Sequence, residues 1–333
     1  MKALVVGAGS IGSRHLKNLF ELGVEIYAVD INPDNAQKAS PISKQTYSSV
    51  DKALRIQPDV AFICTYSNDH IAPAIKCAKA GCHLFIEKPL SLSLDGIDEL
   101  IGIIKEKKLI SMVGCNMRFH PAVSYIYDTL AHNPSFSKKL WGCFEFGFYL
   151  AFDKADYQNC YKANKSMGGN LIFDCIHELD IASWFFGRPA EVICNKSILS
   201  SLKIDTEDHV EMIIKFETGA VCTVHMDYLQ HGYTRRYKVV CDEGTIVWDF
   251  IQGEIGIATV PEKEWQWKDM KLELYYNQMF IDEVKYFLEC VSTGRETFNS
   301  IQQALPILKL AIAANKSCHT NVWERIEEVA WEK

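Results

Sequence analysis

The first twelve residues restrict the possible folds of this chain more than any other stretch. Lys2–Gly12, KALVVGAGSIG, places an apolar run before three glycines in the pattern G-x-G-x-x-G, and a helical pattern over Ile11–Leu22 follows. A short apolar run that ends at glycine is typical of a buried parallel strand. Gly7 permits a tight turn, Gly9 lets a pyrophosphate approach the backbone, and Gly12 lets helix and strand pack closely. The stretch therefore predicts a strand, a turn and a helix whose N-terminal N–H groups bind phosphate.

An acidic residue strengthens this pattern, because three glycines in six residues also occur by chance in loops. A second apolar strand, Glu25–Val29, ends at Asp30, which lies 18 positions after Gly12 (30 − 12). A carboxylate there can accept hydrogen bonds from both ribose hydroxyls of the adenosine, and it would repel a 2′-phosphate. We therefore expect NAD rather than NADP as the cofactor. A doubly wound protein that binds no nucleotide remains the alternative at this point.

Composition narrows the functional classes. The chain has 333 residues, of which 48% are hydrophobic, so it can bury a sizeable core and is long enough for two domains. A formal net charge of −7 gives no electrostatic reason to bind nucleic acid or an anionic membrane, and we expect neither partner. No apolar run approaches the roughly 20 residues of a membrane span, and Lys2 leads into a strand rather than a signal peptide.

The 12 cysteines are scattered and contain no C-x-x-C pair, so they support neither a zinc ribbon nor a thioredoxin-like site. Most of them lie in apolar runs and are expected to be small core residues in a reducing compartment. We therefore expect a cytoplasmic protein.

Strands and helices alternate at short spacing in the first part of the chain, which predicts a Rossmann-type, doubly wound parallel sheet. After Asp30 the expected strands are Val60–Thr65, His83–Ile86 and Ile110–Gly114, and the expected helices are Tyr47–Ile56, His70–Ala80 and Leu94–Lys107. Ligands of such sheets bind outside the carboxyl ends of the strands. The polar segments at these ends should therefore converge on one crevice; they are Asp30, Thr65–His70, Glu87–Pro89 and Asn116–Arg118.

Past Pro121 the pattern changes to runs joined by short turns such as Glu217-Thr218-Gly219, which is typical of antiparallel hairpins. The expected strands are Leu140–Tyr149, Ala190–Ser197, His209–Phe216, Ala220–Asp227, Tyr237–Cys241, Gly244–Phe250 and Glu254–Val260, and the expected helices are Val123–Ala131, Asn170–Phe186, Asn277–Ser292 and Ser300–Lys316. We therefore divide the chain into a nucleotide-binding domain, residues 1–120, and an α+β domain, residues 121–333, with a large, mostly antiparallel open sheet. Aromatic residues such as Trp248, Trp265 and Trp267 favour a partner subunit on this sheet, and hence a homodimer or homotetramer.

Lys88 is the first candidate for chemistry. In Glu87-Lys88-Pro89 the proline forces Lys88 into an extended conformation at a strand end, close to where a nicotinamide would lie. An alcohol that loses hydride must also lose its hydroxyl proton, and a lysine that burial has made neutral can take it. A solvated lysine at a strand end is the competing interpretation, and the spacing favours neither.

The second candidate is the segment Gly168–Asp180, GGNLIFDCIHELD. Asp174 and His177 are three positions apart and would share a face of the expected helix. The surrounding residues are apolar, so ionisable groups there need partners or a function. A carboxylate can orient a neighbouring histidine as an acid/base group. A histidine satisfied within the core stays open as an alternative, and a metal site is disfavoured because no third ligand is evident, so we expect no metal.

These motifs together resemble the Gfo/Idh/MocA oxidoreductase family, which includes glucose–fructose oxidoreductase and inositol dehydrogenase. The resemblance covers almost the whole chain and rests on Gly7–Gly12, Glu87–Pro89, Asn116–Pro121 and Gly168–Asp180 in this order. It implies a Rossmann domain, a second domain with an open sheet used for oligomerisation, and reversible hydride transfer between NAD(P) and a sugar, polyol or related carbonyl compound. It also implies that the Lys88–Pro89 peptide bond is cis.

The resemblance also implies roles for individual residues. The expected catalytic residues are Lys88, His177 and Asp174. The expected cofactor-binding residues are Gly7, Gly9, Ser10, Ile11, Gly12, Asp30, Thr65, Asn68, His70, Glu87, Lys88 and Asn116. The expected substrate-binding residues are Arg118, Tyr157, Tyr161 and His177, with Tyr228 or His231 as further candidates.

One departure from the family pattern bears on the substrate. The family's usual segment is D-x-G-x-H, whereas here Asp174 and His177 are three apart and the glycine is absent. The segment is similar to D-x-x-H-E-x-D, which occurs in a subgroup linked to surface polysaccharide and nonulosonic sugar biosynthesis. It makes the role of His177 more secure than that of Asp174, and inositol or plain glucose less favoured as substrates.

The sequence thus predicts an NAD-dependent oxidoreductase acting on an amino sugar, a nucleotide sugar or a nonulosonic-acid-related substrate. One alternative is a non-catalytic NAD-binding sensor or assembly protein of the same fold. Another is an enzyme that retains NAD as a recycled cofactor.

Overall fold

The computed structural model describes residues 1–153, 156–260, 262–270 and 276–326. The chain forms two compact units. The first consists of Met1–Asn116 and Tyr276–Leu308, and the second of Met117–Tyr275 and Lys309–Lys333. The residues from Tyr276 to Leu308 thus pack with the N-terminal sheet, although they lie between two segments of the second unit in the sequence.

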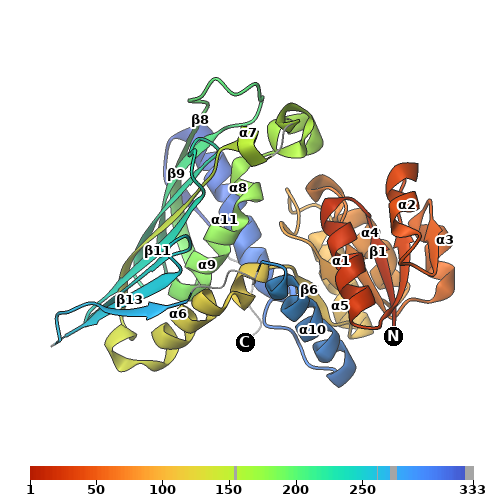
Figure 1. Ribbon diagram of the computed structural model, residues 1–333, viewed down its shortest axis with the longest axis horizontal. Helices are drawn as coiled ribbons and strands as arrows, with labels where there is room; N and C mark the ends of the chain where they lie inside the picture. Colours follow the sequence, from red (N-terminus) through yellow and green to blue (C-terminus); the bar gives the residue numbers. More distant parts are fainter. Residues whose placement is uncertain (154–155, 261, 271–275, 327–333) are drawn as a thin grey trace. The chain divides into compact units, whose positions relative to one another are not determined.

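The first unit is built on a six-stranded parallel sheet with the strand order β3-β2-β1-β4-β5-β6 (Figure 1). Its strands are β1 (Lys2–Val6), β2 (Glu25–Val29), β3 (Gln45–Tyr47), β4 (Val60–Ile63), β5 (His83–Ile86) and β6 (Ser111–Val113). Its helices are α1 (Ser10–Glu21), α2 (Pro33–Ala39), α3 (Val50–Ala53), α4 (Ile71–Lys79), α5 (Ile97–Lys107) and α10 (Gln278–Thr293). This strand order is that of dinucleotide-binding sheets, and it confirms the predicted doubly wound domain.

The central strands of this sheet are apolar because helices cover them on both faces. All four residues of β4 are fully buried. The short edge strand β3, in contrast, is polar and gave no apolar signal. The predicted helix over Tyr47–Ile56 is therefore wrong at its start, since Tyr47 pairs with Val29 in the sheet and α3 begins only at Val50.

The second unit is built on a nine-stranded sheet with the order β14-β13-β12-β11-β7-β10-β9-β8-β15. Its strands are β7 (Lys139–Gly147), β8 (Pro189–Ser197), β9 (His209–Phe216), β10 (Val221–Asp227), β11 (Thr234–Cys241), β12 (Gly244–Asp249), β13 (Glu254–Thr259), β14 (Gln266–Asp269) and β15 (Glu324–Arg325). Neighbouring strands are antiparallel except β7 and β10, which are parallel. The prediction of a large, mostly antiparallel sheet is confirmed.

Helices cover one face of this sheet (Figure 1). They are α6 (Pro121–His132), α8 (Leu171–Asp174), α9 (Ile176–Phe186) and α11 (Ile301–Thr320), and a short helix, α7 (Leu150–Asp153), follows β7. Burial alternates along β9 accordingly: Val210 and Met212 are buried, whereas Glu211 and Ile213 are exposed. We call the opposite side the open face; it carries Trp141, Cys143, Glu145, Ile193, His209, Glu211, Ile213, His225, Arg236, Val247 and Trp267. Among the described residues, every helix is too short or too polar to cross a membrane.

Candidate active site

The glycine turn after β1 has the geometry that each of its three glycines was expected to provide. Gly7 has φ +91°, a left-handed conformation that side chains rarely adopt. A Cβ on Gly12 would collide with the carbonyl oxygen of Gly7. A Cβ on Gly9 would meet nothing within 4 Å, so this glycine faces open space. The turn therefore needs Gly7 and Gly12 for its own folding, while Gly9 leaves room for a ligand such as a pyrophosphate.

The start of α1 offers donors to such a ligand. Its N-cap is Gly9, and no side chain caps the helix. The first N–H groups of a helix have no acceptor within the helix, and the helix dipole is positive at this end. Asp30 lies beside the same turn, because the Ala8 N–H donates to Asp30 Oδ2 (2.7 Å) and the Asn35 side chain donates to the same oxygen (3.1 Å). The N–H groups predicted to bind phosphate and the carboxylate predicted to bind ribose thus lie together at the ends of β1 and β2.

His70 joins two of the predicted cofactor segments. Its Nδ1 lies 2.8 Å from the carbonyl oxygen of Pro89, and its Nε2 lies 3.1 Å from the carbonyl oxygen of Thr65. The ring is 2% exposed, and burial lowers the pKa of His70. This histidine therefore ties the loop after β4 to the segment after β5. Asn68, in contrast, is exposed on the same loop.

Glu87 has a partner that sequence reasoning did not select. His15 of α1 is completely buried, and its Nε2 lies 2.6 Å from Glu87 Oε1. Burial opposes ionisation of Glu87, but the hydrogen bond and charge of His15 outweigh it and hold the pKa of this carboxyl below its usual value. A contact between α1 and the end of β5 thus fixes the residue that precedes Lys88.

Lys88 is half-buried directly after β5, and the Lys88–Pro89 peptide bond is cis, as the family resemblance implied. Asn116 follows β6 and is 8% exposed. The first unit therefore brings together, at the carboxyl ends of its strands, the predicted cofactor residues and Lys88. The Cys115 N–H beside this cluster donates to Glu283 of α10, a contact from a distant part of the chain.

In the second unit the predicted helix over Asn170–Phe186 is two helices. The backbone leaves the helical conformation at Cys175 (φ −97°, ψ 27°), between α8 and α9. Asp174 and His177 therefore do not lie on one continuous helix. Each acid of the segment is held by partners from other elements: Tyr228 donates to Asp174 Oδ2 (2.7 Å), and Arg118 pairs with Asp180.

Two arginines neutralise the buried acids of α9. Arg118 donates from Nε to Asp180 Oδ2 (2.9 Å) and from an amino group to Asp180 Oδ1 (2.6 Å), and both side chains are nearly inaccessible. Arg235 of β11 donates to Glu178 Oε1 (2.9 Å). Burial raises the pKa of Glu178, and the charge of Arg235 opposes that rise. Arg118, predicted as a substrate ligand, thus makes a bidentate ion pair within the protein.

His177 differs from its surroundings. From Leu171 to Ser183 it is the one residue that is not buried. A polar ring that reaches the surface of an otherwise buried segment is available to a ligand. Nearby, Tyr161 forms a side-chain hydrogen bond with Asp174, and burial together with the Asp174 charge raises the pKa of Tyr161 well above its usual value.

The remaining predicted substrate residues differ in accessibility. Tyr157 is half-buried, and its hydroxyl accepts a hydrogen bond from the Lys203 N–H (3.3 Å). His231 is exposed and stacks on Tyr149 (ring centroids 4.5 Å apart). Tyr228 is fully buried with its hydroxyl on Asp174, so it supports that carboxylate instead of lining a surface.

Comparison with protein families gives two matches. The model described as an oxidoreductase family with an NAD-binding Rossmann fold matches residues 1–115, and the model described as the GFO/IDH/MocA C-terminal domain matches residues 144–247. Together they include the whole first sheet, strands β8 to β11 of the second sheet and most of the predicted site residues.

Individual proteins match over nearly the full length. Myo-inositol 2-dehydrogenase of Thermotoga maritima is 26% identical, covering 99% of this chain and 99% of its own. 4-Carboxy-2-hydroxymuconate-6-semialdehyde dehydrogenase of Sphingobium sp. is 25% identical (92% and 95% covered), and UDP-N-acetylglucosamine 3-dehydrogenase of Acidithiobacillus ferrooxidans is 25% identical (90% and 91%). The solved structure of levoglucosan dehydrogenase in complex with NADH has a TM-score of 0.88 at 19% identity, covering 99% of this chain and 100% of that chain, and it shows the same fold.

Proposed function

The chain belongs to the Gfo/Idh/MocA family of NAD-binding oxidoreductases, and on that premise we propose that it transfers a hydride between NAD and a sugar-type substrate. One observation carries the proposal: the glycine turn, Asp30 and Lys88 lie at the carboxyl ends of strands of a single parallel sheet. That is where α/β sheets of this strand order bind dinucleotides.

The residues of the first unit suit NAD. The N–H groups at the start of α1 would bind the pyrophosphate, and Asp30 would accept hydrogen bonds from the adenosine ribose. A 2′-phosphate would be repelled by the same carboxylate, which favours NAD over NADP. When bound, NAD supplies the hydride acceptor for the oxidation of a carbon that bears a hydroxyl group.

Lys88 and His177 would handle the proton. As the substrate carbon gives up a hydride, its hydroxyl must release a proton, and a neutral Lys88 amine would take it to become an ammonium group. His177 would assist that transfer as an acid/base group, and Asp174, with Tyr161 and Tyr228 around it, would fix the start of α9. Reduction of a carbonyl compound runs through the same residues in the opposite direction.

The substrate class is the finer part of the proposal. Two of the relatives are named for an inositol and a nucleotide sugar, and the segment Asp174–Asp180 is similar to the subgroup linked to polysaccharide and nonulosonic sugar biosynthesis. Tyr157, Tyr161 and Arg118 would then contact the substrate, because aromatic faces and hydrogen-bonding groups suit a sugar surface. The semialdehyde dehydrogenase among the relatives makes an oxo acid the competing class.

A substrate panel tests the function. The purified protein is mixed with NAD and, in separate reactions, with amino sugars, nucleotide sugars, nonulosonic acids, inositols and oxo acids, and NADH is followed by absorbance. We expect NADH formation with a member of the first three classes. Turnover of oxo acids alone would contradict the substrate class, while binding of NADH without turnover of any compound would favour the non-catalytic alternative.

Oligomerisation and cellular location extend the proposal. The open face exposes Trp141, Ile213 and Trp267, which favours a homodimer or homotetramer through this sheet. The 12 cysteines are scattered without a C-x-x-C pair, which favours a protein of the reducing cytoplasm. Light scattering coupled to size-exclusion chromatography should give a dimeric or tetrameric mass, and a monomeric mass would contradict this part.

A further inference from the structure

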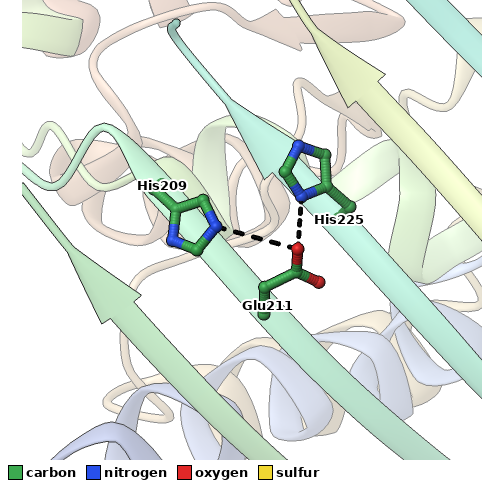
Figure 2. Close-up of side chains that lie close together, drawn as sticks. All are labelled: His209, Glu211 and His225. Atoms are coloured by element: carbon green, nitrogen blue, oxygen red, sulfur yellow. Dashed lines mark hydrogen bonds and ion pairs between the residues drawn. The ribbon is translucent and has the colours of Figure 1, made fainter. Parts of the chain in front are cut away.

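Three potential metal ligands lie together on the open face of the second sheet, opposite the helices that carry Asp174 and His177. They are His209 and Glu211 of β9 and His225 of β10 (Figure 2). His209 and Glu211 are two residues apart on one strand, so they point to the same side, and Glu211 pairs directly with His225 across the two strands. Strand geometry thus places all three side chains at one spot.

The distances suit a small cation. Glu211 Oε1 lies 2.6 Å from His225 Nδ1 and 3.7 Å from His209 Nε2, and one ligand atom from each of the three residues lies within 4.8 Å of the others. Tetrahedral zinc with bonds of about 2.0–2.1 Å holds its ligand atoms about 3.3 Å apart. Small rotations of the three side chains would therefore create the coordination geometry without movement of the strands.

Asp227 completes the arrangement from behind His225. Its Oδ2 lies 2.6 Å from His225 Nε2, while its Oδ1 accepts the N–H groups of Leu229 (2.7 Å) and Gln230 (3.0 Å). In a histidine that binds a metal, the N–H group of the other ring nitrogen characteristically donates a hydrogen bond to a carboxylate. This bond fixes the tautomer and the ring orientation. Here that carboxylate is itself buried and held by the backbone, so Nδ1 of His225 is aimed at the site.

We propose that His209, Glu211 and His225 bind one divalent transition ion of the zinc type, with Asp227 as the positioning residue of His225. Two imidazoles and one carboxylate are ligands that zinc prefers. Two positive charges on the ion match the carboxylates of Glu211 and Asp227. The ion would connect β9 to β10, and its binding is independent of the NAD chemistry.

A competing arrangement needs no metal. A protonated His225 between Glu211 and Asp227 would form an ion-pair network, and His209 would then contribute nothing. The two arrangements therefore differ in what they require of His209.

Zinc titration of the full-length chain tests the proposal. The protein is freed of metal with a chelator, dialysed, and titrated with Zn²⁺ against a chromophoric competitor. We expect one zinc ion per chain. His209→Ala, Glu211→Gln and His225→Ala should each weaken binding at least about 100-fold, because each removes one of three ligands. Asp227→Asn should weaken it about 10- to 100-fold.

His132→Ala is the matched control, since this histidine lies at the exposed end of α6. Its zinc affinity should equal that of the wild type. Tryptophan fluorescence, measured for every variant, reports whether the second unit has folded, because all 7 tryptophans belong to its segments. Glu211→Gln keeps the volume of the side chain if an alanine variant does not fold. Absence of stoichiometric zinc in the wild type would overturn the proposal.

Unchanged affinity in His209→Ala would also overturn it, because the zinc would then be held without His209. The Co²⁺-loaded protein adds a spectroscopic check, because a thiolate-to-cobalt charge-transfer band would place the ion on cysteines instead. We expect d–d bands without that charge-transfer band.

Discussion

His120 caps α6 as a neutral acceptor, so acidification should destabilise the second unit. The Ala122 N–H donates to Nδ1 of His120 (3.2 Å), and the ring packs against Trp248 and Phe250 with centroids 5.2 and 5.7 Å away. Burial, together with the positive charge of Arg235, lowers the pKa of His120 from 6.5 to about 4. A protonated ring could not accept the capping hydrogen bond.

The sign and size of the effect follow from linkage. Between pH 6.5 and pH 4 the unfolded chain binds a proton that the folded chain does not bind, so the free energy of unfolding falls as the pH falls. The difference between the pKa of His120 in the unfolded and in the folded chain corresponds to about 3 kcal/mol in the free energy of unfolding. About 2 kcal/mol of this stability is lost between pH 7.5 and pH 5. Above about pH 7.5 this histidine no longer contributes a pH dependence.

Tryptophan fluorescence during urea unfolding measures this loss, because all 7 tryptophans belong to the segments of the second unit. His120→Asn is the matched variant, since asparagine also caps helices but does not titrate. Its free energy of unfolding should fall less between pH 7.5 and pH 5 than that of the wild type, by about 2 kcal/mol. An identical pH dependence in the two proteins would refute a neutral, buried His120.

Three further predictions concern the two units. Gly9→Ala should keep the wild-type melting temperature but lower NAD affinity at least about 30-fold in a fluorescence titration. Gly12→Ala, in contrast, should lower the melting temperature itself. If Gly9→Ala binds NAD as tightly as the wild type, the turn does not have the role assigned to it. Asp30→Ala should weaken NAD about tenfold and reduce its preference over NADP, and unchanged selectivity in the same titration would remove Asp30 from the ribose site. Asp180→Asn leaves Arg118 buried without its counter-charge, so it should cost about 3 kcal/mol in urea unfolding, and a loss below about 1 kcal/mol would show that the pair is not desolvated.

The parts of the fold with a local signal were predictable from the sequence. The apolar run, the three glycines and Asp30 act within 30 residues, and together they specify the first strands of the parallel sheet. The short edge strand β3 was missed because its residues Gln45–Tyr47 are polar, and the break at Cys175 was missed because apolar periodicity continues through it. In both places tertiary contacts decide the local conformation.

The partners of the buried ionisable groups were harder to predict because they come from distant segments. His15 and Glu87 are 72 positions apart, and Asp174 and Tyr228 are 54 apart. The position of Arg235 could have been used to predict a partner. Alternation of buried and exposed residues along its strand assigns Arg235 to the buried side, where an arginine requires a carboxylate.

The cluster of His209, Glu211 and His225 on the open face could also have been predicted from the sequence. Glu211 and His225 are equally distant from Thr218, the centre of the predicted hairpin turn, so the turn alone sets their pairing. A search for metal ligands at helical or short linear spacing does not find these three residues. The register of the hairpin, in contrast, predicts that Glu211 and His225 lie opposite each other.

The central claim is that Lys88 takes the substrate proton, and steady-state kinetics of Lys88→Ala and Lys88→Arg on an identified substrate tests it most directly. Arginine keeps the charge but cannot lose a proton, so both variants should lower kcat at least about 100-fold. NAD affinity, measured on the same samples, should stay within about twofold of the wild type, because we expect most of the binding contacts to come from the glycine turn and Asp30. Wild-type turnover in either variant would contradict the account.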